Sequence, residues 1–267
     1  MRQAVAFMFC CSGLLQAEPI RIKGSDLLGA KVVPVLCEEY RRQHPTARFE
    51  IAAEGGEAFG RLPDFLAGRV DILMAHKELG PREISPFEKA GVALTKSYAM
   101  TDFFAIAVHP SNPVESLTMA QVEALFTGEH ANWKAVGGND APVSVYTRNT
   151  ASSTYRLFQV AAMKGRPYSS KLVRLAGGEL ASMSVAKDPQ GITYLGNLYA
   201  RGKDLKVVKI DGIDPLGKDV RRYPLLRPAF YYFRDNARPE VQDLVTWMST
   251  SPEAAEIVRK TGFLKME

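Results

Sequence analysis

The N-terminal part of the chain alternates between short extended segments and segments with helical spacing, and this alternation restricts the fold more than any other feature. Extended segments with many apolar residues occupy 20–23, 49–52 and 70–75. Between them, apolar residues recur at helical spacing over 30–42 and 59–66. Strand, helix and strand in succession predict a parallel sheet with helices on both faces, so an α/β fold is expected.

The carboxyl ends of these predicted strands fall at 24–26, 53–56 and 76–78. In open parallel sheets, ligands bind beyond this edge. Further along the chain, Thr118 is expected to cap a short helix that ends near Phe126. Other strands are predicted at 103–108, 143–146, 191–196, 205–210 and 229–233, and two terminal helices at 239–249 and 253–260.

Residues 148–154, with the sequence Arg-Asn-Thr-Ala-Ser-Ser-Thr, join a predicted strand to the start of a predicted helix. A helix N-terminus has unpaired backbone N–H groups and a partial positive charge, which together favour an anion. Arg148 adds a planar, permanently charged set of donors that suits carboxylate, phosphate or sulfate. The alternative is an ordinary Ser or Thr cap beside a surface arginine, which is more common for any single loop.

Residues 1–17 have the layout of a secretory signal peptide: a short basic start, an apolar run over 4–15, and Ala17 as the expected last residue before cleavage. The apolar run is too short to span a membrane as a helix. Lipid attachment at Cys10 or Cys11 is the alternative, but the residues before Cys10 are bulky. A secreted or periplasmic protein without membrane insertion is therefore predicted.

Composition excludes several other classes of protein. Only Cys37 remains after the leader, so no internal disulfide is possible, and its helical, apolar surroundings predict a buried thiol. The histidines lack partners at metal-ligand spacing, and neither a metal site nor a cofactor is predicted. The net charge of +5 favours anionic partners. Nucleic acid is not among them, because basic and aromatic residues do not form a shared stripe.

Several motifs between residues 24 and 233 resemble those of the phosphate-binding proteins of ABC phosphate importers. They are the sequences His-Pro-Ser-Asn-Pro at 109–113, Leu-Phe-Thr-Gly at 125–128, Asn-Trp-Lys at 132–134, Gly-Ile-Thr-Tyr-Leu-Gly at 191–196 and Tyr-Pro-Leu-Leu-Arg-Pro at 223–228. This resemblance implies the type II periplasmic binding protein fold, in which two Rossmann-like lobes are joined by two crossing strands and hold an anion in the cleft. It places a signal peptide at 1–17, lobe 1 at 18–102 plus 225–267, and lobe 2 at 103–224.

In lobe 2, the resemblance implies that the Arg148 loop binds the anion. The family's Arg…Ser-Gly-Thr pattern corresponds here to Arg148, Ser152, Ser153 and Thr154, with Ser153 in place of glycine. Arg148 would pair with the charge of the anion. Residues 152–154 would donate from hydroxyl groups and backbone N–H groups.

In lobe 1, the chain departs from the family's pattern. Leu27 and Ala53 occupy positions where the family has hydroxyl donors, and each missing hydrogen bond to a buried anion costs about 1–3 kcal/mol. Ser25 is predicted to donate from the first turn. The family's carboxylate, which accepts the proton of bound phosphate, falls near His76.

Three residues of lobe 1 have two interpretations each. His76 is either a donor to a fully ionised anion such as sulfate, or a hydrogen-bonded residue at the rim. Glu54 is either the acceptor for a protonated oxygen or a solvated loop carboxylate. Asp26 is either a ligand or the cap of the following helix.

The main functional hypothesis is a monomeric extracytoplasmic protein that captures inorganic phosphate or a related oxyanion for an ABC permease. The alternative is a periplasmic sensor or adaptor on the same fold, with a changed or lost anion site. An enzyme with Ser153 as nucleophile and His76 as base is the weakest hypothesis, because the two residues are predicted on opposite sides of a cleft that opens.

Overall fold

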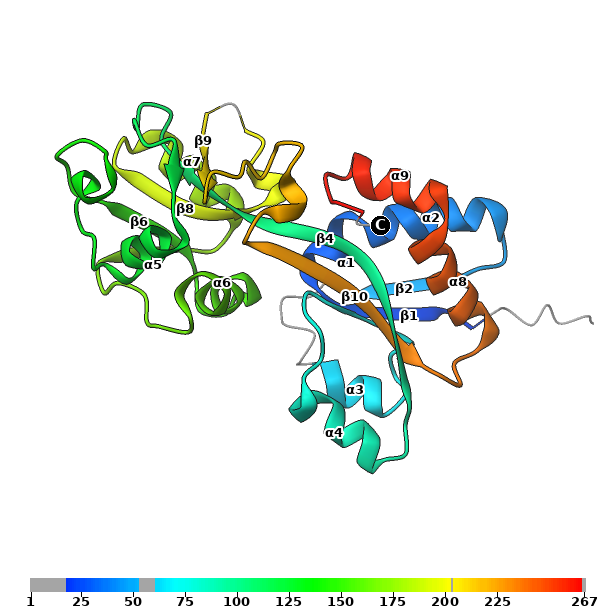
Figure 1. Cartoon of the computed structure of the whole chain (residues 1–267). Coiled ribbons are helices and arrows are strands. Elements are labelled where there is room, and N and C mark those ends of the chain that lie inside the picture. Colours follow the sequence, from blue (N-terminus) through cyan, green and yellow to red (C-terminus); the bar gives the residue numbers. More distant parts are fainter. Residues whose placement is uncertain (1–17, 53–60, 203, 266–267) are drawn as a thin grey trace, which may run out of the picture.

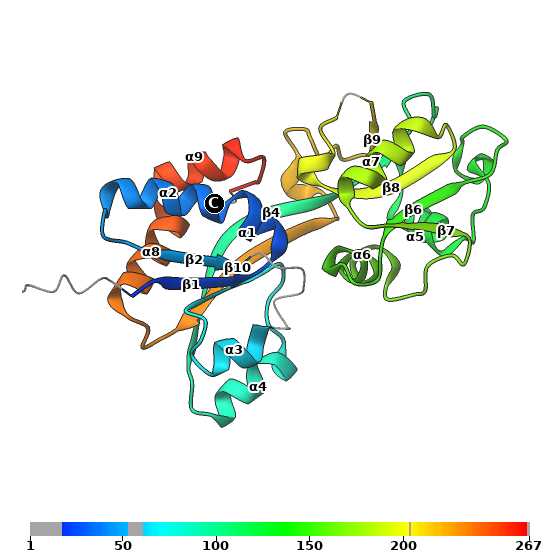
Figure 2. The same cartoon turned by 180° about the vertical axis from the view of Figure 1, so that it is seen from behind.

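The computed structural model describes residues 18–52, 61–202 and 204–265 (Figure 1). The chain forms two lobes that two long strands connect, as both views show (Figures 1 and 2). Lobe 1 contains β1 (Ile20–Gly24), β2 (Phe49–Ala52), β3 (Ile72–Ala75), α1 (Asp26–Lys31), α2 (Val33–Gln43), α3 (Leu62–Leu66), α4 (Pro81–Lys89), α8 (Pro239–Thr250) and α9 (Pro252–Lys260). Lobe 2 contains β5 (Ser116–Leu117), β6 (Ser144–Arg148), β7 (Leu172–Leu175), β8 (Gly191–Gly196), β9 (Lys206–Ile210), α5 (Met119–Thr127), α6 (Ser153–Met163) and α7 (Gly178–Lys187). The connecting strands are β4 (Leu94–Val108) and β10 (Leu226–Arg234).

The sheet of lobe 1 is parallel over its first three strands, as the sequence predicts. β1 lies between β2 and β3 and pairs with both in parallel. Alternate residues of β3 face opposite sides: Ile72 and Met74 join one core cluster with α2, α8 and α9, whereas Leu73 and Ala75 join another with α3 and α4. The sheet is therefore buried on both faces, and its carboxyl edge is free to hold a site.

The two connecting strands run antiparallel to each other over most of their length. β10 pairs with β4 from Leu226 opposite Phe103 to Arg234 opposite Leu94, and it also pairs with β3 of lobe 1. The remaining end of β4 pairs with β8 and β9 of lobe 2. One curled sheet thus extends through both lobes. The lobe boundaries at 102/103 and 224/225 stay predictions.

Lobe 2 repeats the α/β pattern around an aromatic core. β6 pairs in parallel with β7 and β8. Phe104, Phe126, Phe158 and Tyr194 pack together there, and the rings of Phe158 and Tyr194 stack with centroids 4.0 Å apart. Thr118 caps α5 as predicted, since its hydroxyl accepts a hydrogen bond from the backbone N–H of Gln121 at 3.1 Å.

The region predicted as one helix over 30–42 is two helices. α1 begins already at Asp26, and α2 follows after Val32. The cap of α1 is Ser25, whose hydroxyl accepts from the backbone N–H of Leu28 at 3.3 Å. The interpretation of Asp26 as the cap is therefore wrong, because Asp26 is the first residue of the helix itself.

The thiol of Cys37 is buried in lobe 1, as predicted, with 2% of the residue exposed. Burial raises the pKa of this thiol to about 12, so it stays protonated at neutral pH.

We expect Cys37 to react with an aromatic disulfide reagent more than about 100-fold more slowly in the native protein than in urea, because only the thiolate attacks. The release of the coloured thiol at pH 8 measures both rates. Equal rates would show that Cys37 is accessible in the native state.

Candidate functional site

A cavity of about 190 Å³ lies between the two lobes, at the carboxyl ends of the strands. Both lobes and one connecting strand contribute to it. Its lining consists of Ser25, Ala30, Lys31, His76, Arg148, Ser152, Thr154, Gly178, Tyr194, Leu195, Gly196, Tyr199 and Arg227. This placement agrees with the expectation that ligands bind beyond the carboxyl edge of the sheet.

Three side chains of this lining have buried polar atoms without a hydrogen-bond partner among the described residues. They are both ring nitrogens of His76, Nε of Arg148 and Nε of Arg227. Buried polar groups are normally paired, because an unpaired one loses its hydration without replacement. Three such groups in one cavity indicate a site whose hydrogen bonds are completed by a ligand.

The N-terminus of α6 also opens on the cavity. Ser152 is the residue that precedes this 11-residue helix, yet its hydroxyl makes no capping hydrogen bond. Ser152 and Thr154 both line the cavity, at the end of the helix where the first backbone N–H groups have no acceptor within an α-helix. The helix N-terminus and the hydroxyls together favour an anion.

Arg148 is the last residue of β6, so the strand fixes the start of its side chain. Its backbone N–H points to the hydroxyl of Tyr194 at 3.4 Å. Tyr194 is in turn held by its stacking on Phe158 and by the phenol of Tyr168, 3.4 Å away. The aromatic core of lobe 2 therefore holds the arginine at the edge of the cavity.

Arg227 lies on the connecting strand β10 and forms a buried ion pair with Asp102 of β4. Its guanidinium also lies over the ring of Phe104, 4.2 Å from the centroid. Arg227 was not predicted as a site residue. The sequence feature that could have identified it is its position inside the 223–228 motif, directly before an apolar strand.

Burial lowers the pKa of His76 well below its usual value near 6.5, and the positive charge of Arg227 lowers it further. The imidazole is therefore neutral at pH 7 in the empty cavity. Both ring nitrogens of His76 are buried and neither has a hydrogen-bond partner among the described residues, which favours the interpretation of His76 as a ligand over that of a hydrogen-bonded rim residue.

The structure places the other predicted site residues as follows. Ser25, His76, Arg148, Ser152 and Thr154 line the same cavity, although they come from both lobes. Asp26 and Ser153 are the first residues of α1 and α6, respectively. Glu54, like Ala53, lies outside the described residues. Lys31 and Tyr199 line the cavity without having been predicted.

The described lining contains no carboxylate, while Lys31, Arg148 and Arg227 carry positive charge. Asp102 pairs with Arg227, so the charges of Lys31 and Arg148 remain in excess, and such an excess in a partly buried space lowers the free energy of a bound anion. No group of acidic, histidine or cysteine side chains that could hold a metal ion occurs among the described residues. The chemistry of the lining is therefore that of an anion site.

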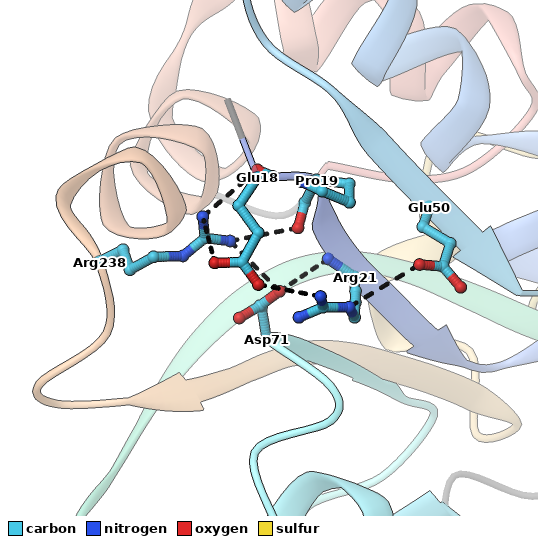
Figure 3. A network of polar contacts seen from close by, with 6 residues as sticks. All are labelled: Glu18, Pro19, Arg21, Glu50, Asp71 and Arg238. Atoms are coloured by element: carbon cyan, nitrogen blue, oxygen red, sulfur yellow. Dashed lines mark hydrogen bonds and ion pairs between the residues drawn. The ribbon is translucent and has the colours of Figure 1, made fainter. Parts of the chain in front are cut away.

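A larger hollow, of about 680 Å³, lies at the opposite ends of the lobe 1 strands. Its charged residues already pair with one another, as Figure 3 shows: Arg238 donates to the carbonyl of Pro19 at 3.2 Å and lies 3.5 Å from a carboxylate oxygen of Asp71. Arg21 donates to Glu18 at 2.9 Å. Because these groups are satisfied, we take the smaller cavity between the lobes as the candidate site.

The two lobes, the two connecting strands and the anion-binding cavity between the lobes define a solute-binding protein of the type II periplasmic binding fold. The chain belongs to the PBP superfamily domain family, whose model matches residues 15–253. In the part of the chain that the structure describes, we found no helix both long and apolar enough to cross a membrane.

Two curated relatives match nearly the whole chain. The phosphate-binding protein PstS of Pseudomonas aeruginosa PAO1 is 28% identical over 270 residues, which cover 91% of this chain and 81% of the relative. The PstS of Bacillus subtilis 168 is 24% identical over 250 residues, which cover 92% and 80%.

Solved structures also resemble the chain over most of its length. A protein from Clostridium perfringens, crystallised with bound phosphate, shares 26% identity with a TM-score of 0.76, and the match covers 94% of this chain and all of that one. An ABC-type phosphate transport receptor from Vibrio cholerae has a TM-score of 0.80 at 24% identity, over 93% of this chain and all of that one. The latter likeness concerns the fold alone.

Proposed function

We propose that this chain is an extracytoplasmic solute-binding protein that captures inorganic phosphate or a related tetrahedral oxyanion for an ABC importer. The observation that carries this proposal is the convergence on one cavity of buried nitrogen atoms that have no hydrogen-bond partner among the described residues, namely both ring nitrogens of His76 and the Nε atoms of Arg148 and Arg227. The names of the curated relatives, which are phosphate-binding proteins, support it.

Each group of the lining has a role in this proposal. Arg148 pairs with the anion's charge through its planar donors, and Ser152, Ser153 and Thr154 donate from the start of α6. Ser25, at the start of α1, and His76, after β3, approach the anion from lobe 1. Arg227 contributes a second guanidinium from the connecting strand. Asp26 and Glu54 remain further ligand candidates from lobe 1.

Binding is coupled to closure in this proposal. The anion contacts residues 18–102 and 225–267 on one side and residues 103–224 on the other, and β4 and β10 act as the hinge between these lobes. A permease then recognises the closed form. The chain acts as a monomer after removal of residues 1–17, outside the cytoplasm, and we propose no catalytic reaction for it. The sensor or adaptor alternative is not favoured, because the cavity still presents its donors.

Addition of phosphate to ligand-free mature protein (residues 18–267) is expected to raise its thermal stability. The protein is unfolded and refolded first, so that carried-over ligand is removed. A ligand at ~1,000 times its dissociation constant adds about 4 kcal/mol to the free energy of unfolding, which a thermal-shift assay detects easily. Sulfate, molybdate, a phosphonate and a carboxylate are compared at the same concentration. The absence of any shift, confirmed by calorimetric titration, would contradict capture of a small anion.

A further inference from the structure

His76 is the one histidine among the described residues whose ring nitrogens are both buried without a hydrogen-bond partner. It follows directly after β3, a fully buried strand, so its backbone is firmly held. By contrast, Nδ1 of His109 lies 2.7 Å from the hydroxyl of Ser111. A buried imidazole with two unused nitrogens costs free energy, and its place in the lining of the cavity indicates that a ligand supplies the missing partner.

The charged groups that line the cavity beside His76 are cations, and the buried carboxylate of Asp102 on β4 is already paired with one of them, Arg227. The titratable groups that share the cavity with it are Lys31 of α1, Arg148 of β6, Tyr194 of β8, Tyr199 beyond β8 and Arg227 of β10. None of them is an acid that would stabilise an imidazolium in the empty cavity. This agrees with the lowered pKa of His76, which burial and then Arg227 cause.

A bound anion reverses this balance. Two negative charges placed beside Arg148, Arg227 and His76 favour the imidazolium, and they oppose both burial and the charge of Arg227, which keep the imidazole uncharged. A protonated ring also donates an N–H to an anion oxygen, and such a charge-assisted bond is about twice as strong as a neutral one. The binding free energy is therefore most favourable when the anion and the proton enter together.

We infer that His76 is a direct ligand of the anion and takes up one proton from solvent when a doubly charged tetrahedral oxyanion enters the cleft. The proton moves from water or buffer to the free nitrogen of the neutral ring, and no covalent bond to the anion forms. This inference rests on the proposed function, and it adds the charge of the preferred ligand and the coupling to protons.

Proton uptake makes affinity depend on pH in a defined direction. Uptake occurs above the pKa of His76 in the empty cleft, which is well below 6.5, and below its raised pKa in the complex. Within that window, affinity rises as pH falls, by up to tenfold for each pH unit. Above the window the ring is neutral in both states, and below it the ring is charged in both states, so the dependence disappears.

Sulfate is the most direct probe, because it carries no proton of its own near neutral pH. Calorimetric titrations of the ligand-free mature protein with sulfate are performed at about pH 7 in two buffers of different ionisation enthalpy. The difference between the two observed heats gives the number of protons taken up. We expect a value between zero and one that rises as the pH is lowered from about 8 toward 6.

The variant His76→Gln keeps a donor and an acceptor but cannot titrate. We expect it to bind sulfate at least tenfold more weakly than wild type at about pH 6, with no proton uptake and no dependence on pH. His130→Gln is the matched control, since His130 does not line the cavity. It should behave as wild type in both measurements.

The outcomes separate this inference from the proposed function. Binding of sulfate without proton uptake, or equal uptake by His76→Gln, overturns the inference and leaves the proposed function standing. Binding of phosphate but not of sulfate also overturns the inference and leaves the proposed function standing. The inferred site needs no acceptor for a ligand proton, so it should bind sulfate as well. Binding of neither anion overturns both.

Discussion

Replacement of Arg148 by alanine is expected to weaken anion binding by about 100-fold, which corresponds to about 3 kcal/mol. Arg148 lines the cavity, and its Nε is buried without a partner among the described residues, so the bound anion is its natural acceptor. The substitution removes a charge-assisted hydrogen bond and one positive charge together. Calorimetric titration of ligand-free protein with phosphate measures the loss directly.

Two further variants show whether the effect belongs to the guanidinium itself. Arg148→Lys keeps the charge but loses the planar pair of donors, so we expect an intermediate affinity. Arg156→Ala removes an exposed arginine of the same helix region, which does not line the cavity, and should bind as wild type does. If Arg148→Ala binds phosphate as tightly as Arg156→Ala, Arg148 is a surface arginine beside an ordinary helix cap.

The local half of the site was predictable because it follows from short-range patterns. An alternating segment before residue 148 and helical spacing after residue 154 predict a strand-to-helix junction, and the structure has β6 and α6 there. Parallel order then brings Ser25 and His76 to the same edge of one sheet. The strand–helix alternation alone was therefore enough to predict which edge of the sheet holds the site.

The parts that were missed depend on long-range pairing. Arg227 and Asp102 are 125 residues apart, and no local pattern shows that their strands lie side by side. β4 was predicted only over 103–108, but it begins at Leu94. Polar residues at 95–97 and 101–102 obscure the earlier part, which is extended because it pairs with β10. Pairing partners, not propensity, decide such strands.

Two smaller elements escaped prediction for local reasons. The helix α4 contains Pro86 in its interior, which interrupts the usual pattern of a helix. The strand β7 is four residues long and lies at the edge of the sheet, with Val173 exposed, so its apolar pattern is weak. Neither element lines the candidate cavity.

Replacement of Asp102 by alanine is expected to lower the free energy of unfolding of the ligand-free protein by about 3–5 kcal/mol. The side chains of Asp102 and Arg227 are 0% and 7% exposed, so the variant leaves a guanidinium buried without its counterion. Asp102 also accepts a hydrogen bond from the backbone N–H of Asn197 at 3.2 Å, which ties β8's continuation to the connecting strands. Urea unfolding monitored by fluorescence and by circular dichroism measures the loss and tests whether the lobes unfold together.

A double variant, Asp102→Leu with Arg227→Met, distinguishes an unpaired charge from a simple loss of packing. It removes both charges and should recover much of the lost stability, because no ion remains buried alone. Asp140→Ala breaks an exposed pair with Lys134 and should change the stability by less than about 1 kcal/mol. If Asp102→Ala lowers the free energy of unfolding by no more than Asp140→Ala does, water reaches the guanidinium of Arg227.

The Asp102→Ala variant also tests whether Arg227 faces the bound anion. Without Asp102, the positive charge of Arg227 remains in the lining of the cavity with no counterion. An anion that contacts it then supplies the missing negative charge, so phosphate should stabilise Asp102→Ala more than it stabilises wild type. The double variant lacks this charge and should gain the least. Equal stabilisation of all three proteins by phosphate would place Arg227 outside the anion's reach and restrict its role to holding the two connecting strands together.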